Sequence, residues 1–118
     1  MEALCRIRDI YRAITEFEIR FMQQYDLSLN EGMLLCTLLG QPKLTSGEIA
    51  EALGLSNSNA SKVIRSVEQK KLITRLVGKE DKRQMYFTLT SEGKNRISAI
   101  KGADFALPDL LQQVVNLD

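Results

Sequence analysis

The chain has 118 residues, of which 44% are hydrophobic and 26% are charged, and it contains two prolines. A chain of this length builds one hydrophobic core, and its composition excludes both a disordered chain and a membrane protein, so we expect one soluble globular domain over residues 1–118. The 16 Lys and Arg residues nearly balance the 15 Asp and Glu residues, and the net charge of +1 by itself points to no particular partner.

Residues 1–25 predict a long amphipathic helix. Apolar side chains recur at spacings of three and four residues, with charged side chains between them. The apolar stripe consists of Leu4, Ile7, Ile10, Ile14, Phe17 and Phe21. This spacing resembles the seam of a coiled coil but extends over only about two heptads, so a partner helix is one interpretation.

Two capping boxes mark the starts of the next two helices. In such a box a Ser or Thr hydroxyl and a Glu carboxylate three residues later satisfy each other's backbone amides. Ser28 and Glu31 predict the start of a helix that ends near Gly40. Thr45 and Glu48 predict the start of a short helix, and the chain between the two helices is expected to be a loop.

A tight turn joins the short helix to a longer one. Gly54 ends the short helix, and Ser56 caps a helix that runs to about Lys70. The small side chain of Ala50 suits the close crossing of two such helices. The inward-facing stripe of the longer helix consists of Ala60, Val63, Ile64 and Val67, and its other face is polar. This pattern predicts a helix-turn-helix.

A β-hairpin is predicted directly after the helix-turn-helix. Two runs with high β-propensity, at 72–77 and 85–89, flank a polar turn at 78–84. A helix-turn-helix followed by a hairpin is the winged-helix pattern, in which the strands cover the core and their loop projects as a wing. We therefore expect a mainly α fold with a small β-hairpin.

Two more helices are predicted after the hairpin. Thr90 caps one that extends to roughly Lys101, and Gly102 breaks it. Pro108 opens a last amphipathic segment. The apolar residues of this segment are Leu107, Leu110, Leu111, Val114 and Val115.

The charge is distributed unevenly along the chain. Residues 56–84 hold eight basic and three acidic residues, a net charge of +5, and the other 89 residues carry a net charge of −4. Clustered cations of this kind bind phosphate groups and make the affinity depend on salt. The near-neutral total is therefore the sum of a basic segment and an acidic remainder, and the basic segment favours a nucleic-acid partner.

The polar face of the longer helix carries side chains suited to contact DNA. In the major groove Asn bonds adenine, and Arg or Lys bonds guanine. The candidate DNA-binding residues on this face are Asn57, Ser58, Asn59, Ser61, Lys62 and Arg65. A merely solvated helix face is the alternative, but the position directly after the turn of a helix-turn-helix favours DNA binding.

Three stretches of the sequence carry a family resemblance. They are Leu-Thr-Ser-Gly-Glu-Ile-Ala-Glu-Ala-Leu-Gly-Leu-Ser at 44–56, Val-Ile-Arg-Ser-Val-Glu-Gln-Lys-Lys-Leu-Ile at 63–73, and Glu-Asp-Lys-Arg-Gln-Met-Tyr-Phe-Thr-Leu-Thr-Ser-Glu-Gly at 80–93. Together they resemble the MarR family of winged-helix transcriptional regulators over about residues 28–100. The most specific part is the Asp-Lys-Arg of the wing, followed by residues 89–93.

The resemblance implies a homodimer that binds palindromic operators in double-stranded DNA. We expect a repressor, and activation is the alternative that the resemblance leaves open. It divides the chain into a winged-helix DNA-binding lobe at 28–93 and dimerisation helices at 1–27 and 94–118. In the family the matching helix enters the major groove. A small ligand in an apolar cleft between the dimerisation helices and the lobe is a further expectation.

The wing residues expected to contact DNA are Lys79, Asp81, Lys82 and Arg83. The resemblance implies that Arg83 enters the minor groove and that Asp81 holds it. A guanidinium suits the negative potential of a narrow minor groove, and a carboxylate two residues away can fix its orientation. A merely soluble turn is the alternative.

Two features depart from the family pattern. Lys71 stands where family members usually have glycine, because the chain leaves the helix through a left-handed conformation. A lysine in that conformation costs about 1 to 2 kcal/mol, or else the helix ends differently. The C-terminal segment is shorter than usual and is interrupted at residues 102–104 and 108. We expect Leu110, Leu111, Val114 and Val115 to be exposed and to need a partner, while the geometry of the dimer helices is left open.

No residue pattern predicts catalysis. The chain has no histidine and two cysteines, and we find no metal-ligand cluster, no glycine-rich phosphate loop and no nucleophile paired with a base. We therefore expect no catalytic residue, no metal, no cofactor and no enzyme activity. Cys36 is expected in the core, and Cys5 is either a redox-sensing thiol or an ordinary packing or surface thiol.

The sequence predicts a cytoplasmic protein without a membrane partner. Its N-terminus has no secretory apolar region, and no run reaches the length of a membrane span. A second interpretation of the function is a winged helix used as a protein-interaction module, in which the cationic face meets an acidic protein and not DNA.

Overall fold

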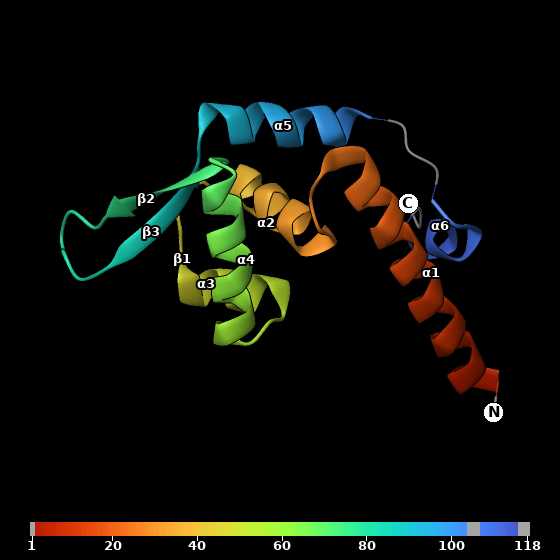
Figure 1. Ribbon diagram of the computed structural model, residues 1–118. Coiled ribbons are helices and arrows are strands. Elements are labelled where there is room, and N and C mark those ends of the chain that lie inside the picture. Colours follow the sequence, from red (N-terminus) through yellow and green to blue (C-terminus); the bar gives the residue numbers. More distant parts are fainter. Residues whose placement is uncertain (1, 104–106, 116–118) are drawn as a thin grey trace. The chain divides into compact units, whose positions relative to one another are not determined.

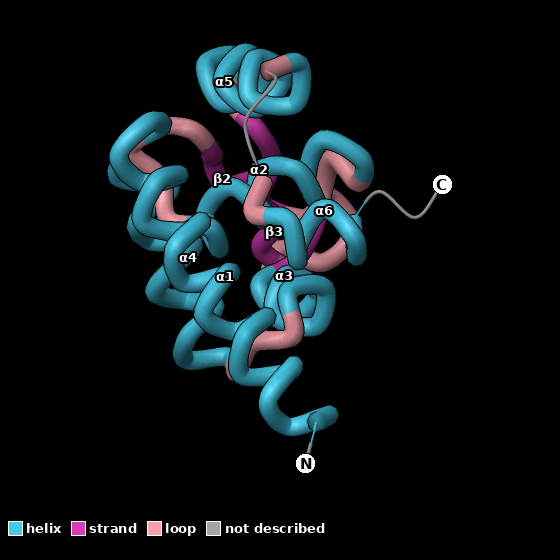
Figure 2. Tube along the Cα trace, turned by 90° about the vertical axis from the view of Figure 1, so that its right-hand side faces the viewer, coloured by secondary structure: helices cyan, strands magenta, loops and turns pink. Residues whose placement is uncertain are grey.

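The computed structural model describes residues 2–103 and 107–115, which form six helices and one three-stranded sheet (Figure 1). The elements are α1 (Glu2–Tyr25), α2 (Leu29–Gly40), β1 (Leu44–Thr45), α3 (Ser46–Leu53), α4 (Asn57–Gln69), β2 (Ile73–Val77), β3 (Met85–Leu89), α5 (Ser91–Gly102) and α6 (Asp109–Val115). Helices make up most of this part of the chain (Figure 2), which confirms the mainly α fold.

The chain divides into two compact units. The first comprises Met1–Leu29 with Asp104–Asp118, and the second comprises Asn30–Ala103. Parts of the C-terminal segment predicted for dimerisation, at 104–106 and 116–118, lie outside the described residues.

In the first unit, the apolar stripe of α1 is divided between buried and exposed side chains. Phe17 and Phe21 are buried, and the centroids of their rings lie 5.9 Å apart. Towards the N-terminus, Leu4, Ile7 and Ile14 expose 56, 59 and 41% of their surface. The N-terminal part of the stripe is therefore accessible to a partner.

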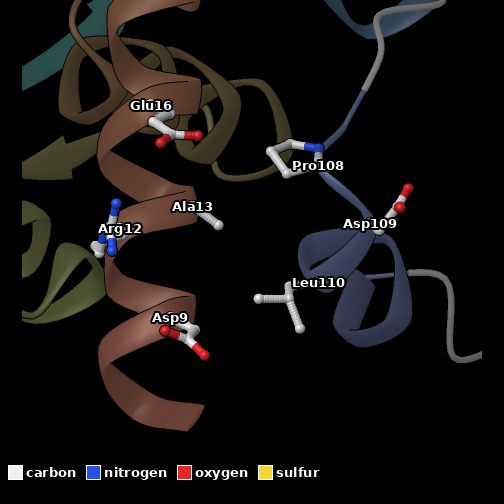
Figure 3. A pocket seen from close by; sticks show the side chains of 7 residues that line it. All are labelled: Asp9, Arg12, Ala13, Glu16, Pro108, Asp109 and Leu110. Atoms are coloured by element: carbon white, nitrogen blue, oxygen red, sulfur yellow. The ribbon is translucent and has the colours of Figure 1, made fainter. Parts of the chain in front are cut away.

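The last helix, α6, packs against α1 within the same unit. Leu110 points toward Ala13 of α1 (Figure 3), and both Leu110 and Leu111 are half-buried. The expectation that these two leucines are exposed is therefore wrong, because α1 covers part of the short helix. Val114 and Val115 expose 53 and 62% of their surface, as expected.

In the second unit, α3 and α4 pack against each other and form the predicted helix-turn-helix. Thr45 and Ser56 cap these helices, and the amide of Asn59 donates to the Ser56 hydroxyl at 3.1 Å. Gly54 ends α3 with a φ of 67°, a left-handed conformation that glycine adopts without strain. The caps and the turn predicted from the sequence are confirmed.

An antiparallel sheet with strand order β1-β3-β2 forms the wing and its base. The predicted hairpin is confirmed, since β2 and β3 pair along their lengths from Ile73 opposite Leu89 onward. The sequence did not predict β1, in which Leu44 lies opposite Phe87. A strand of two residues is too short to show the alternation of apolar and polar residues that predicts a strand, so β1 is recognised only by its pairing with β3. The hairpin projects beyond α3 and α4 (Figure 1), and this unit is a winged helix.

All elements of the second unit contribute to its core. The buried apolar residues are Leu34, Leu35, Leu38, Leu44, Ile49, Ala50, Ala60, Ile64, Val67, Leu72, Ile73, Phe87, Ile97 and Ile100. Cys36 is exposed, so the expectation that it lies in the core is wrong. Leu34, Leu35 and Leu38 mark the buried side of α2. Cys36 is turned about 100° away from Leu35, toward the side of Met33, which exposes 41% of its surface.

Lys71 adopts the left-handed conformation that the resemblance implies at the end of this helix. Its φ is 62°, whereas the preceding Lys70 is right-handed with a φ of −80°. The amide of Leu72 donates to the carbonyl of Val67 at 3.2 Å, and the amide of Lys71 donates to the carbonyl of Glu68 at 2.9 Å. These are the two bonds of a Schellman motif. The helix therefore ends through the left-handed conformation that the resemblance implies, and lysine takes on the strain.

Lys71→Gly is expected to raise the free energy of unfolding by about 1 kcal/mol, because glycine has no Cβ to oppose a positive φ. Urea unfolding followed by circular dichroism measures this change. Lys71→Ala keeps the Cβ and is expected to leave the stability unchanged. Equal stabilisation by the two variants would assign the effect to the lysine charge and not to the backbone.

The capping box at the start of α3 is formed as predicted. The amide of Thr45 donates to Oε1 of Glu48 at 2.9 Å, and the amide of Glu48 donates to Oγ1 of Thr45 at 3.2 Å. Hydrogen bonding of the Glu48 carboxylate to the backbone amide of Thr45, and to a lesser extent to the Thr45 side chain, lowers the pKa of Glu48 below its ordinary value of 4.5. A donor directed at a carboxylate oxygen favours the ionised form.

The stability that this capping box contributes is expected to depend on pH. Because the pKa of Glu48 is lower in the folded chain, the contribution is complete above the ordinary value of 4.5 and is lost as the pH falls through the folded-state pKa. Glu48→Gln removes this dependence. The difference in Tm between wild type and variant should therefore shrink from neutral to acidic pH, and a constant difference across that range would contradict the assignment.

Candidate nucleic-acid interface

The outward face of α4 presents all six side chains predicted to contact DNA. Asn57, Ser58, Asn59, Ser61, Lys62 and Arg65 are exposed. The first three follow the N-cap Ser56 directly, in the first turn of the helix. The helix N-terminus adds a partial positive charge and backbone amides to their polar groups. Ala60, Ile64 and Val67 on the opposite side are buried, so the core holds α4 with its polar face outward.

A groove lies between α4 and the sheet. Its cavity of about 240 Å³ is lined by Ser46, Ser61, Ile64, Arg65, Glu68, Arg75, Met85 and Phe87. The fold thus brings Ser61 and Arg65 of the helix beside the base of the wing. Helix and wing can therefore contact one extended ligand.

At the tip of the wing, Asp81 orients Arg83. Oδ1 of Asp81 accepts hydrogen bonds from the backbone amide of Arg83 at 3.0 Å and from its Nε at 3.3 Å. The Arg83 side chain is 93% exposed, and Lys79 and Lys82 are also exposed. The predicted pair is formed, and its guanidinium is held in one direction while it stays open to a ligand.

Gly78 allows the wing to fold back on itself. Its amide donates to the carbonyl of Gln84 at 2.9 Å, and the amide of Gln84 donates to the carbonyl of Asp81 at 3.0 Å. A Cβ at position 78 would lie 2.6 Å from the Asp81 carbonyl oxygen, so another residue here would displace the loop. Sequence reasoning missed this role, because its only signal was a glycine in a polar turn.

Two cations of the basic segment pair with internal carboxylates. Nζ of Lys70 lies 3.0 Å from Oε1 of Glu31, and Nε of Arg75 lies 2.7 Å from Oε2 of Glu68. Within the described part of the chain, the basic residues of the segment without an ion pair are Lys62, Arg65, Lys71, Lys79 and Lys82. The charge offered to a ligand is therefore concentrated on the outer face of α4, at its end and on the wing.

Glu31, in the first turn of α2, connects this helix to α4. It is 4% exposed, and its Oε2 accepts a hydrogen bond from the Ser66 hydroxyl at 2.8 Å. Its other carboxylate oxygen accepts from Lys70. Sequence reasoning assigned Glu31 only a capping role, since partners 35 and 39 residues later leave no local signal.

The segment that forms this interface matches the sequence profile of a known protein family. The profile of the MarR family matches residues 27–85, which is half of the chain. The chain belongs to the MarR family. The matched residues include α4 and the wing, so the family assignment of this MarR-family chain rests on the same segment as the candidate interface.

A curated protein similar to this MarR-family chain is YwaE of Bacillus subtilis (strain 168), an uncharacterised HTH-type transcriptional regulator. The two are 26% identical over 104 residues, which cover 85% of this chain and 61% of YwaE. The chain therefore spans less than two thirds of the length of this curated relative.

Solved structures similar to this MarR-family chain include those of MepR from S. aureus. A MepR mutant from a multidrug-resistant clinical isolate is 28% identical, with a TM-score of 0.70, over 93% of this chain and 79% of that one. MepR in a complex with DNA is 26% identical, with a TM-score of 0.65, over 92% and 84%. BldR from Sulfolobus solfataricus, 21% identical with a TM-score of 0.75 over 98% and 78%, has the same fold.

The first unit of this MarR-family chain holds a separate cavity of about 280 Å³ between α1 and α6 (Figure 3). It is lined by Asp9, Arg12, Ala13, Glu16, Pro108, Asp109 and Leu110. Four of these seven residues are charged, so the lining differs in character from the apolar ligand cleft expected from the resemblance. That ligand stays a prediction.

Residues 2–103 and 107–115 contain no cluster of three or more side chains able to hold a metal ion. Among the helices in those ranges, none combines the length and the apolarity that crossing a bilayer requires. Cys5 is exposed, which makes it a surface thiol, and a redox role for it stays a prediction.

Proposed function

We propose that this MarR-family protein is a transcriptional regulator that binds double-stranded DNA in a sequence-specific manner. The observation that carries the proposal is the exposed polar and basic face of α4 beside a wing in which Asp81 orients Arg83. Membership of the family and the similarity to MepR, whose structure was solved in a complex with DNA, support it.

In this proposal α4 lies in the major groove. Its amide side chains bond adenine, and its cations bond guanine or phosphates. The residues concerned are Asn57, Ser58, Asn59, Ser61, Lys62 and Arg65. Arg83 enters the adjacent minor groove with its guanidinium fixed by Asp81, while Lys79 and Lys82 approach the phosphates.

We propose further that the protein acts as a homodimer on a palindromic operator. Leu4, Ile7 and Tyr11 on α1 expose 56, 59 and 72% of their surface, and a second copy in a symmetric dimer would cover such apolar side chains. Two α4 helices about 34 Å apart would then occupy successive major grooves. Repression, and tuning of this spacing by a small ligand, are parts of the proposal that stay predictions.

The proposal gives the protein a binding role and no catalytic one. Family regulators act through DNA, and the functional groups on α4 and the wing are those of a binding surface. The cytoplasmic location predicted from the sequence is part of the proposal.

Selection of bound sequences from a random DNA pool tests this function. We expect a palindrome whose half-sites are centred about one helical turn apart. A pool from which no sequence is enriched would contradict DNA recognition and would favour an acidic protein as the partner of the same cationic surface. Enrichment of a single half-site would contradict the dimer and leave DNA recognition in place.

A further inference from the structure

A bidentate ion pair joins α4 to the wing. Glu68 lies in the last turn of α4, and Arg75 lies on β2. Nε of Arg75 donates to Oε2 of Glu68 at 2.7 Å, and Nη2 donates to Oε1 at 2.9 Å. Two parallel hydrogen bonds between planar groups fix orientation as well as distance.

The guanidinium of Arg75 is also held by the sheet. It lies over the ring of Phe87, with 5.4 Å between Cζ and the ring centroid, and Phe87 is its cross-strand partner on β3. Phe87 is only 4% exposed, so the ring that supports the guanidinium belongs to the core. The hydrogen bonds and the charge of Glu68 raise the pKa of Arg75. Arg75 therefore stays charged and is directed at Glu68.

The ion pair lies at the base of the exposed part of the wing and is itself partly exposed. The side chains of Arg75 and Glu68 are 55 and 22% exposed, and ion pairs at such positions stabilise a fold only weakly. Farther out along the hairpin, Leu76, Val77 and Met85 expose 45, 57 and 37% of their surface. The pair thus fastens the hairpin to α4 at the base of its exposed part.

We propose that Glu68 and Arg75 are positioning residues whose ion pair sets the direction of the wing relative to α4. This inference rests on the proposed function, in which α4 and Arg83 must reach adjacent grooves of one duplex together. A rotation at the base of the wing displaces Arg83 at its tip, so a small change at Glu68 becomes a larger one at the minor groove. The pair also neutralises a carboxylate on the helix that faces DNA.

The substitution Glu68→Gln separates this role from direct binding of phosphate by Arg75. It removes one negative charge and so by simple electrostatics should strengthen DNA binding. If the ion pair positions the wing, Glu68→Gln and Arg75→Gln should instead each weaken binding about three- to tenfold. Fluorescence anisotropy with a labelled duplex carrying the selected palindrome measures this change. Tighter binding by Glu68→Gln would overturn the proposal and make Arg75 a phosphate ligand released from its partner.

A matched control is Glu51→Gln on α3. Glu51 is an exposed carboxylate and makes no ion pair within the described part of the chain, so this variant makes the same change in charge. It is expected to bind DNA at least as tightly as wild type. Weakening equal to that of Glu68→Gln would show that the effect does not depend on the ion pair, and would overturn the proposal.

A double-mutant comparison of Glu68→Gln with Arg83→Ala distinguishes misdirection of the wing from a general loss of stability. In the Glu68→Gln background, Arg83→Ala should lose less affinity than in wild type, because a misdirected wing no longer places Arg83 in the groove. The Tm of Glu68→Gln should stay close to that of wild type. Full additivity of the two substitutions would overturn the positioning role.

Residual dipolar couplings of the free protein test the ion pair without DNA. The backbone amides of β2 and β3 should reorient relative to those of α4 in Glu68→Gln, and unchanged couplings would overturn the inference. This measurement keeps the two proposals separable. If the wild-type protein binds no DNA, the proposed function fails, and the couplings still decide whether Glu68 directs the wing.

Discussion

Gly93→Ala is expected to lower the free energy of unfolding by about 3 kcal/mol or more, because it forces a methyl group into backbone atoms. A Cβ at this position would lie 2.0 Å from the carbonyl oxygen of Leu72 and 2.9 Å from its carbonyl carbon. That oxygen already accepts a hydrogen bond from the amide of Thr90 at 3.0 Å, and Leu72 is fully buried. Neither the carbonyl nor α5 can move without breaking this junction between the end of the wing and the helix.

Urea unfolding of Gly93→Ala measures this loss, and Gly47→Ala provides the control. Nothing lies within 4 Å of a Cβ at Gly47, which stands in the first turn of α3. Alanine there should leave the stability equal to wild type or raise it by up to about 1 kcal/mol, because glycine is a poor helix former. A Gly93→Ala variant as stable as wild type would show that the close approach to Leu72 is not required by the fold.

Helix boundaries could be predicted from the sequence because the interactions that set them are local. Thr45, Ser56 and Thr90 cap α3, α4 and α5, and each hydroxyl accepts a hydrogen bond from an amide three residues later. Gly54 ends α3, and its amide donates to the carbonyl of Glu51, three residues earlier. A pattern of four residues therefore contains everything that decides such a cap.

Side-chain environments could not be predicted in the same way, because they depend on residues that are distant in sequence or beyond the end of a helix. Cys36 lies in a helix that is apolar on most sides, so periodicity does not say which side is buried. Glu31 pairs with Lys70, 39 residues later. Glu68 and Arg75 are only seven residues apart, but the chain turns between them, and helical spacing rules do not apply across that turn.

The composition of the candidate interface was predictable, and its electrostatics were not. The polar residues of α4 are exposed because they lie opposite the buried stripe, which the sequence pattern indicates directly. The pairing of Asp81 with Arg83 came from the family resemblance and is confirmed. The net charge of the basic segment overstates what a ligand meets, because Lys70 and Arg75 are paired within the fold.

Arg83→Ala and Lys62→Ala are each expected to weaken binding to the selected palindromic duplex by about 5- to 150-fold, equivalent to about 1–3 kcal/mol. Arg83 is 93% exposed at the tip of the wing, and Lys62 is exposed on the outer face of α4, so neither substitution removes a core contact. Each lost cation should also reduce the slope of log K against log salt concentration by about 1, because a positive charge in either groove displaces one condensed counterion from the DNA. Anisotropy titrations at several salt concentrations give both quantities.

Lys101→Ala is the matched control, because it removes one positive charge from an exposed position in the last turn of α5. It lies outside the basic segment and should change neither the affinity nor the salt dependence. If Lys101→Ala weakens binding as much as the other two, the effect comes from total charge and not from α4 and the wing. An unchanged salt slope for both Arg83→Ala and Lys62→Ala would remove this surface from the DNA interface, since a cation that lies against DNA cannot be lost without that change.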